Sequence, residues 1–134
     1  MIENTEILIR LVMSTIAGGI IGLEREVVHK PAGVRTHMLV CLGSTLFTLI
    51  TLELLPAEAA RLFAGVATGV GFLGAGTIFK SDKDIQGLTT AASIWTTAAL
   101  GLTIGSGFYF MTAIVVILVL IILHLNKFKF FRTL

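Results

Sequence analysis

The chain has 134 residues, of which 55% are hydrophobic and only 13% charged, and its mean hydropathy is +0.96. Water-soluble domains carry about 25% charged residues, so this composition excludes that class and predicts an integral membrane protein. The net charge of +2 is too small to indicate a partner, and we expect no nucleic-acid partner. The single cysteine excludes an internal disulfide.

Five hydrophobic stretches follow one another along the chain, separated by short polar loops. A membrane-spanning helix needs about 20 mostly apolar residues, and each stretch approaches that length. We predict helices over residues 7–23, 36–55, 57–79, 88–105 and 108–126. Because the loops are short, consecutive helices must run antiparallel. The sequence therefore predicts an all-α bundle of about five transmembrane helices, forming a single domain over residues 1–134 without a C-terminal cytosolic domain.

The basic residues fall mainly into alternate loops, which predicts the orientation because positive loops are retained in the cytoplasm. Eight of them lie between the first and second helices, between the third and fourth, or after the fifth: Arg25, Lys30, Arg35, Lys80, Lys83, Lys127, Lys129 and Arg132. The opposite side has only Arg10 and Arg61. We therefore expect the N-terminus outside and the C-terminus inside.

The first two helices carry different signals. In the first, Gly18 and Gly22 form a small-residue pair that lets another helix backbone approach closely. The second carries a polar stripe at helical spacing, formed by His37, Cys41, Ser44, Thr48 and Thr51. Such hydroxyls usually bond their own helix or a neighbouring one, although a stripe can also line a polar path. We expect His37 to be an interfacial residue.

The third helix is rich in glycine, which allows two interpretations. Its glycines are Gly65, Gly69, Gly71, Gly74 and Gly76. Small residues on one face favour close packing of membrane helices, and this is the preferred interpretation. Glycine also disfavours a regular helix, so a break between residues 71 and 76 is the alternative.

The last two helices differ in polarity. The fourth carries a second polar stripe, with Thr90 beside it at the helix start: Thr89, Ser93 and Thr96. Trp95 lies in mid-helix, which indicates packing. The fifth helix is aliphatic on every face, so we expect it to be the most lipid-exposed.

Charged residues gather at the predicted cytoplasmic ends of the helices, where they could converge. The candidate set is Glu24, Arg25, Glu26, Arg35, His37, Asp82 and Asp84. One interpretation is a magnesium site with Glu24 and Glu26 as ligands, because Mg²⁺ takes oxygen ligands and needs only one or two carboxylates. The other is an ion-pair cluster, since the arginines neutralise the carboxylates. Both interpretations stay open at this point.

Four segments together resemble the membrane domain of the MgtC/SapB family. They read GGIIGLERE (residues 18–26), AGVRTH (32–37), GVGFLGAG (69–76) and GLTTAASIW (87–95). The resemblance implies a multi-pass protein of the bacterial or archaeal inner membrane, associated with magnesium limitation and, in some pathogens, with survival inside host cells. Family members are described either as magnesium transporters or as membrane regulators, including regulators of the ATP synthase.

Three classes of function can be weighed on this basis. An enzyme is not expected, because the three histidines are scattered and Cys41 has no evident activating base. A transporter would need a polar path, and a regulator would need a surface for another membrane protein. We expect a function linked to magnesium transport or homeostasis, with no cofactor except Mg²⁺ as a transported or sensed ion. Because five short helices enclose little space, we also expect a homo-oligomer, preferably a dimer.

Overall fold

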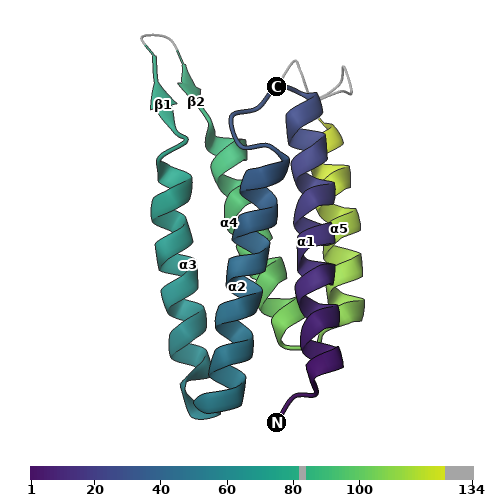
Figure 1. Cartoon of the computed structure of the whole chain (residues 1–134). Helices are drawn as coiled ribbons and strands as arrows, with labels where there is room; N and C mark the ends of the chain where they lie inside the picture. The colour runs from purple at the N-terminus through teal and green to yellow at the C-terminus, as the bar shows by residue number, and fades with distance from the viewer. Residues whose placement is uncertain (82–83, 126–134) are drawn as a thin grey trace.

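A computed structural model describes residues 1–81 and 84–125 of the chain. It is an up-and-down bundle of α-helices with one short hairpin (Figure 1). The helices are α1 (Asn4–Val27), α2 (Val34–Leu54), α3 (Ala59–Ala75), α4 (Leu88–Gly105) and α5 (Tyr109–His124), with a 3₁₀ turn η1 at Pro56–Glu58. The all-helical prediction is confirmed, and each predicted helix is present. Residues 126–134, which include Lys127, Lys129 and Arg132, lie outside the described residues.

Three of these helices are long and apolar enough to cross a membrane. They are α1 with 24 residues, α2 with 21 and α4 with 18. Over its described residues, α5 is a shorter apolar helix of 16 residues. Many large apolar side chains are solvent-exposed, such as Phe72 at 85% and Phe110 at 81%, which suits a surface that contacts lipid rather than water.

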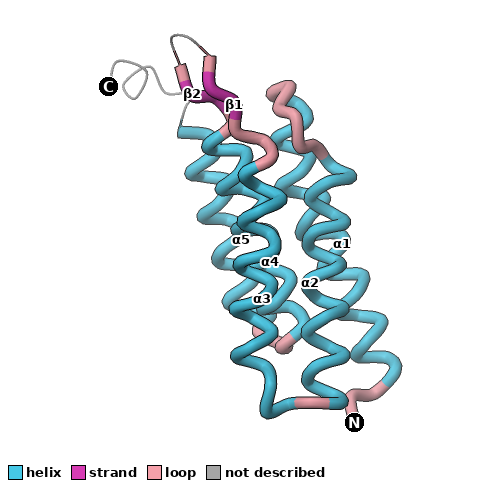
Figure 2. The backbone as a smooth tube through the Cα atoms, turned by 90° about the vertical axis from the view of Figure 1, so that its left-hand side faces the viewer, coloured by secondary structure: helices cyan, strands magenta, loops and turns pink. Residues whose placement is uncertain are grey.

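The connection between α3 and α4 is a β-hairpin that the sequence reasoning missed. Strand β1 (Phe79–Lys80) pairs antiparallel with β2 (Ile85–Gln86), and Figure 2 shows both strands at the end of the bundle opposite the N-terminus. Helix α3 therefore ends at Ala75 rather than at residue 79, and it is unbroken up to that point. Gly87 closes the hairpin with φ +90, where a Cβ would lie 1.8 Å from the carbonyl oxygen of Thr77.

Helix α4 is the centre of the bundle, because it packs against each of the other four helices. Helix α2 lies between α1 and α4 and makes the most extensive contacts with both. The apolar core joins Ile21 of α1, Cys41 of α2, Leu100 and Ile104 of α4, and Val119 of α5. Helices α1, α2 and α4 are the three central helices, and they position the polar groups described below.

Two pairs of glycines bring these central helices into close contact. A Cβ on Gly18 would lie 2.5 Å from the carbonyl oxygen of His37, and one on Gly22 would lie 2.6 Å from Cα of Val34. In α4, a Cβ on Gly101 would lie 2.4 Å from the carbonyl oxygen of Cys41. A Cβ on Gly105, four residues later, would lie 2.5 Å from Cβ of Thr48. These positions admit no side chain, as expected of glycine-mediated packing between membrane helices.

Helix α3 is peripheral, and within this single chain most of its glycines do not make the close contact that their small-residue face predicts. Of its 17 residues only Gly74 is buried, against Ala91 of α4. Within the described part of the chain, a Cβ on Gly65, Gly69 or Gly71 would meet nothing within 4 Å, and Gly76 contacts only its own turn. The expectation that α5 is the most exposed helix is also wrong, because α5 buries Thr112, Val119 and Leu123.

Candidate functional site

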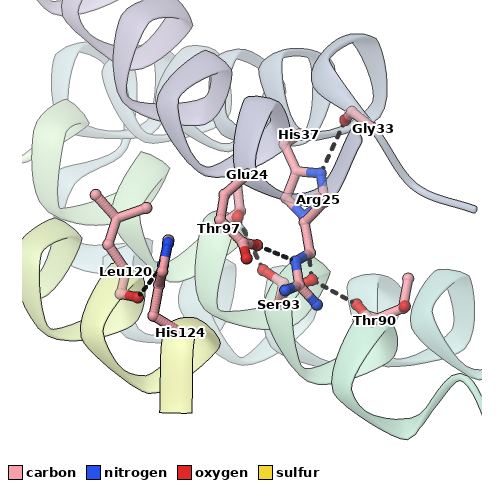
Figure 3. A network of polar contacts seen from close by, with 9 residues as sticks. All are labelled: Glu24, Arg25, Gly33, His37, Thr90, Ser93, Thr97, Leu120 and His124. Atoms are coloured by element: carbon pink, nitrogen blue, oxygen red, sulfur yellow. Dashed lines mark hydrogen bonds and ion pairs between the residues drawn. The ribbon is translucent and has the colours of Figure 1, made fainter. Parts of the chain in front are cut away.

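A cluster of buried polar side chains lies where α1, α2 and α4 meet, near the end of the bundle that carries the α1–α2 loop (Figure 3). Its members come from all three helices. We call this set the polar cluster: Glu24 and Arg25 of α1, His37 of α2, and Thr90, Ser93 and Thr97 of α4. The sequence predicted five of these residues but not Thr97.

Glu24 and Arg25 form a buried ion pair in which Nε of Arg25 donates to Oε2 of Glu24. Their side chains are only 7% and 4% exposed, respectively. Successive residues on a helix do not normally face each other, so both side chains must bend to meet. The second carboxylate oxygen, Oε1, is buried and has no hydrogen-bond partner among the described residues. One oxygen of the Glu24 carboxylate therefore pairs with Arg25, and the other has no hydrogen-bond partner among the described residues.

His37 is fully buried, which contradicts the expected interfacial position. Its Nδ1 lies 2.9 Å from the carbonyl oxygen of Gly33, which can only accept, so Nδ1 carries a proton. Its Nε2 lies 3.1 Å from the hydroxyl of Ser93, which also lies 2.8 Å from the carbonyl oxygen of Thr90. When the ring is neutral, Nε2 accepts a hydrogen bond from the Ser93 hydroxyl. When the ring is charged, Nε2 donates to the Ser93 oxygen, and the Ser93 hydroxyl donates to the carbonyl oxygen of Thr90. The histidine connects α2 directly to α4.

The polar stripe of α2 faces α4, and this agrees with the interpretation that its side chains mediate contact with a neighbouring helix. His37, Cys41, Ser44 and Thr48 are buried, and Thr51 is half-buried. Thr48 bonds its own helix, donating to the carbonyl oxygen of Ser44, and Thr97 of α4 donates likewise to the carbonyl oxygen of Ser93. Thr45, which the sequence reasoning did not select, donates across to the carbonyl oxygen of Gly101 at 2.9 Å.

On α4 the buried polar face shares Ser93 with the predicted stripe and differs from it by one residue in the turns on either side. Thr90, Ser93 and Thr97 are buried, whereas Thr89 is exposed and Thr96 is half-buried. The spacing of three and then four between these inward residues is also helical, so it could have identified Thr97. Trp95 is 51% exposed and donates to the carbonyl oxygen of Ala67, linking α4 to α3.

The other charged candidates do not join the polar cluster. Oε2 of Glu26 accepts a hydrogen bond from the amide of Val34 at 2.8 Å, so this acid faces the start of α2 rather than Glu24. Arg35 is exposed beside the same loop, and Asp84 is exposed in the hairpin turn. Asp82 lies outside the described residues. The predicted pairing of Arg25 with Glu24 is present, whereas no described ion pair joins Arg35 to either glutamate.

The structure does not place Glu24 and Glu26 as a joint ligand pair for a metal. Among residues 1–81 and 84–125, no group of three or more His, Cys, Asp or Glu side chains is placed to hold a metal ion. Mg²⁺ usually keeps several waters and takes only one or two protein carboxylates. Glu24 alone, with its free oxygen, is therefore the group of the predicted set that best fits a hydrated cation.

A second polar network ties the opposite end of the bundle together. Arg10 of α1 pairs with Glu6 at 2.8 Å, donates to the hydroxyl of Tyr109 of α5 at 3.2 Å, and donates to the carbonyl oxygen of Gly105 at 2.7 Å. The hydroxyl of Tyr109 in turn donates to Glu6. Because each charged group here has partners, this network is a clamp between α1 and the α4–α5 turn.

The peripheral position of α3 leaves an apolar groove between α2 and α3. Its volume is about 600 Å³. Leu39, Gly43 and Phe47 line it from α2, and Gly65 and Gly69 line it from α3. The groove is separate from the polar cluster, which lies on the other side of α2 against α1 and α4.

Comparison with known proteins decides which family this arrangement belongs to. The family model described as the MgtC family matches residues 11–129. The chain belongs to the MgtC family. The resemblance noted in the sequence is confirmed, and the polar cluster lies within the matched residues.

Several relatives of the MgtC family align with most of the chain. It is 43% identical to the "Putative magnesium transporter YhiD" of Escherichia coli (strain K12), over 94% of this chain and 64% of the relative. It is 39% identical to "Protein SapB" of Bacillus subtilis (strain 168), over 79% and 50%. It is 38% identical to "Protein MgtC" of Brucella abortus (strain 2308), over 77% and 44%. The chain thus spans about half to two thirds of these relatives, and no solved structure matches it.

Proposed function

We propose that the chain is the multi-pass transmembrane part of an inner-membrane protein that acts in magnesium transport. Its five helices span the membrane, with the N-terminus outside and the α1–α2 loop and the β-hairpin in the cytoplasm. Membership of the MgtC family, the printed name of the YhiD relative and the exposed apolar surface support this proposal. The basic residues of the two cytoplasmic connections support the orientation.

The observation that carries the proposal is the buried pair of Glu24 and Arg25. Ionisable groups inside a membrane protein are costly and usually serve ion or proton movement. Here one carboxylate oxygen lacks a partner although the side chain is 7% exposed. An unsatisfied buried acceptor costs free energy, so this oxygen is open to a ligand that the described residues do not supply.

A second candidate is a regulator that binds another membrane protein, such as the ATP synthase. Two observations favour it. The polar face between α2 and α4 is closed by direct contact at Gly101, so an ion path through one chain requires helix movement or a second copy. The groove between α2 and α3 is open and apolar, which suits a helix of another protein.

Reconstitution separates the two candidates. The purified protein is placed in liposomes that contain a magnesium indicator, and magnesium entry is recorded after external Mg²⁺ is added. We expect entry with the wild-type protein, loss of entry with Glu24→Gln, and normal entry with Glu26→Gln, in which the amide oxygen still accepts from Val34. Absence of entry with correctly inserted wild-type protein would favour the regulator.

A further inference from the structure

The unpartnered Oε1 of Glu24 requires a ligand that the described residues do not supply. The side chain is more than nine-tenths buried, and its other oxygen is held by Arg25. A buried acceptor without a donor or a cation is costly, and most such atoms in proteins are satisfied. Water, a hydrogen-bond donor or a cation could satisfy this oxygen.

The neighbouring hydroxyls narrow the choice. Figure 3 shows Ser93 and Thr97 of α4 beside the Glu24 carboxylate. The Thr97 hydroxyl donates a hydrogen bond to the carbonyl oxygen of Ser93. The Ser93 hydroxyl lies within hydrogen-bond distance of the carbonyl oxygen of Thr90 and of Nε2 of His37. Because their hydrogens are already engaged in these hydrogen bonds, the hydroxyl oxygens of Ser93 and Thr97 can only accept from, or coordinate, a further group. A carboxylate beside acceptor oxygens has the chemistry of a site for a hard cation that retains part of its water.

Arg25 is the obstacle to such a site and also the means of opening it. Its guanidinium already neutralises Glu24, and a neutralised carboxylate binds cations weakly. The pair joins adjacent helix positions, whose side chains do not naturally face each other. Arg25 also lies in the last turn of α1, which ends at Val27, so a change of rotamer can carry its guanidinium toward the aqueous boundary.

We propose that Glu24 binds a hydrated hard divalent cation in exchange for Arg25. In the cation-free state Arg25 occupies Oε2, and in the cation-bound state the carboxylate and the acceptor hydroxyls of α4 face the ion while Arg25 turns outward. This exchange deepens the proposed function and rests on it for the physiological ion, which is Mg²⁺. It makes the polar cluster a site whose occupancy follows the cytoplasmic cation concentration.

The exchange is tested by measuring cation binding to the full chain in detergent-free nanodiscs that are made of zwitterionic lipid. Mn²⁺ replaces Mg²⁺ as the probe because its electron paramagnetic resonance signal reports the free ion directly. We expect about one Mn²⁺ bound per chain, displaced by Mg²⁺. Binding should be lost in Glu24→Gln, retained in Glu24→Asp, and tightened roughly tenfold in Arg25→Gln, because the competing cation is removed.

Glu26→Gln is the matched control. It removes the same charge only two residues from Glu24, but the Glu26 side chain faces the start of α2 instead of the polar cluster. Its Mn²⁺ binding should equal that of the wild-type chain. Equal losses in Glu24→Gln and Glu26→Gln would overturn the exchange, as would absence of binding to the wild-type chain. If Glu24→Gln does not fold, Arg25→Gln decides: unchanged or weaker binding there contradicts competition by Arg25.

Binding and transport can fail separately. Glu24-dependent magnesium entry without Mn²⁺ binding would reject the exchange and leave the proposed function standing. Glu24-dependent Mn²⁺ binding without magnesium entry would keep the exchange and reject transport in favour of a sensing or regulatory role.

Discussion

At the scale of single residues, the same amino acid has opposite roles in different helices of this protein. Gly18 and Gly101 sit where another backbone leaves no room for a Cβ. Gly65 and Gly69 have the same spacing as Gly18 and Gly22 but face the open groove beside α2. Small residues let helices approach, but a second surface is needed for the approach to occur.

This contrast predicts different outcomes for two leucine substitutions. Gly18→Leu should destabilise the fold by about 3 kcal/mol or more, because the new side chain forces α1 away from the backbone of His37. Gly69→Leu should leave the fold intact, since its Cβ meets nothing within 4 Å in the described part of the chain. Thermal unfolding followed by circular dichroism in detergent gives the comparison.

The Gly69→Leu variant also tests the homodimer that the sequence leads us to expect. If two copies associate through α3, the added side chain should shift the protein from dimer to monomer in nanodiscs without changing its thermal unfolding. Equal destabilisation of both variants would contradict the peripheral position of α3. An unchanged dimer in Gly69→Leu would exclude α3 as its interface.

Sequence reasoning at this scale identified most of the polar cluster and missed its arrangement. The sequence points to Glu24, Arg25, His37 and Ser93 because polar groups are rare in such an apolar chain. Glu26 lies at the same helix end as Glu24, but residues two apart lie on different sides of a helix, and Glu26 faces Val34 instead. The orphan oxygen of Glu24 depends on the rotamer that Arg25 adopts, and sequence does not contain that information.

At the scale of elements, the helix bounds followed the sequence closely where local composition decides them. Helix α4 has the predicted bounds, and α2 begins and ends within two residues of them. The end of α3 was misplaced because Phe79 and Lys80 pair with residues beyond the turn, a non-local effect. The burial of α3 could not be predicted either, since it depends on which surfaces the other helices leave available.

The clamp at the N-terminal end of the bundle gives a prediction for the contacts between elements. Arg10→Gln should lower the free energy of unfolding by about 2 kcal/mol, because it removes a charged group that bonds Glu6, Tyr109 and the carbonyl oxygen of Gly105. Unfolding by increasing fractions of sodium dodecyl sulfate measures the loss. Arg61→Gln is the control, since Arg61 is 84% exposed and pairs only locally with Glu58.

At the scale of the whole molecule, the proposed orientation can be tested with single cysteines. In a protein with Cys41→Ala, Glu58→Cys should react with an impermeant thiol reagent added outside the cell. Asp84→Cys, which is also exposed, should react only after the membrane is opened. The two positions lie in the α2–α3 and α3–α4 connections, so α3 must separate them if it spans the membrane. Outside labelling of Asp84→Cys would contradict the five-span topology.

The central position of α4 has a consequence for biosynthesis. The ribosome delivers α1 and α2 to the membrane well before α4, so the polar face of α2 initially has no cover. Thr48 already bonds its own helix, so its hydroxyl does not become an unsatisfied polar group in the membrane before α4 arrives. Thr45 and His37 of this face wait for partners on α4, the carbonyl oxygen of Gly101 and the hydroxyl of Ser93. The arrival of α4 therefore supplies both partners during translation, and a nascent chain halted within α3 would still present both groups to chaperones and proteases of the membrane.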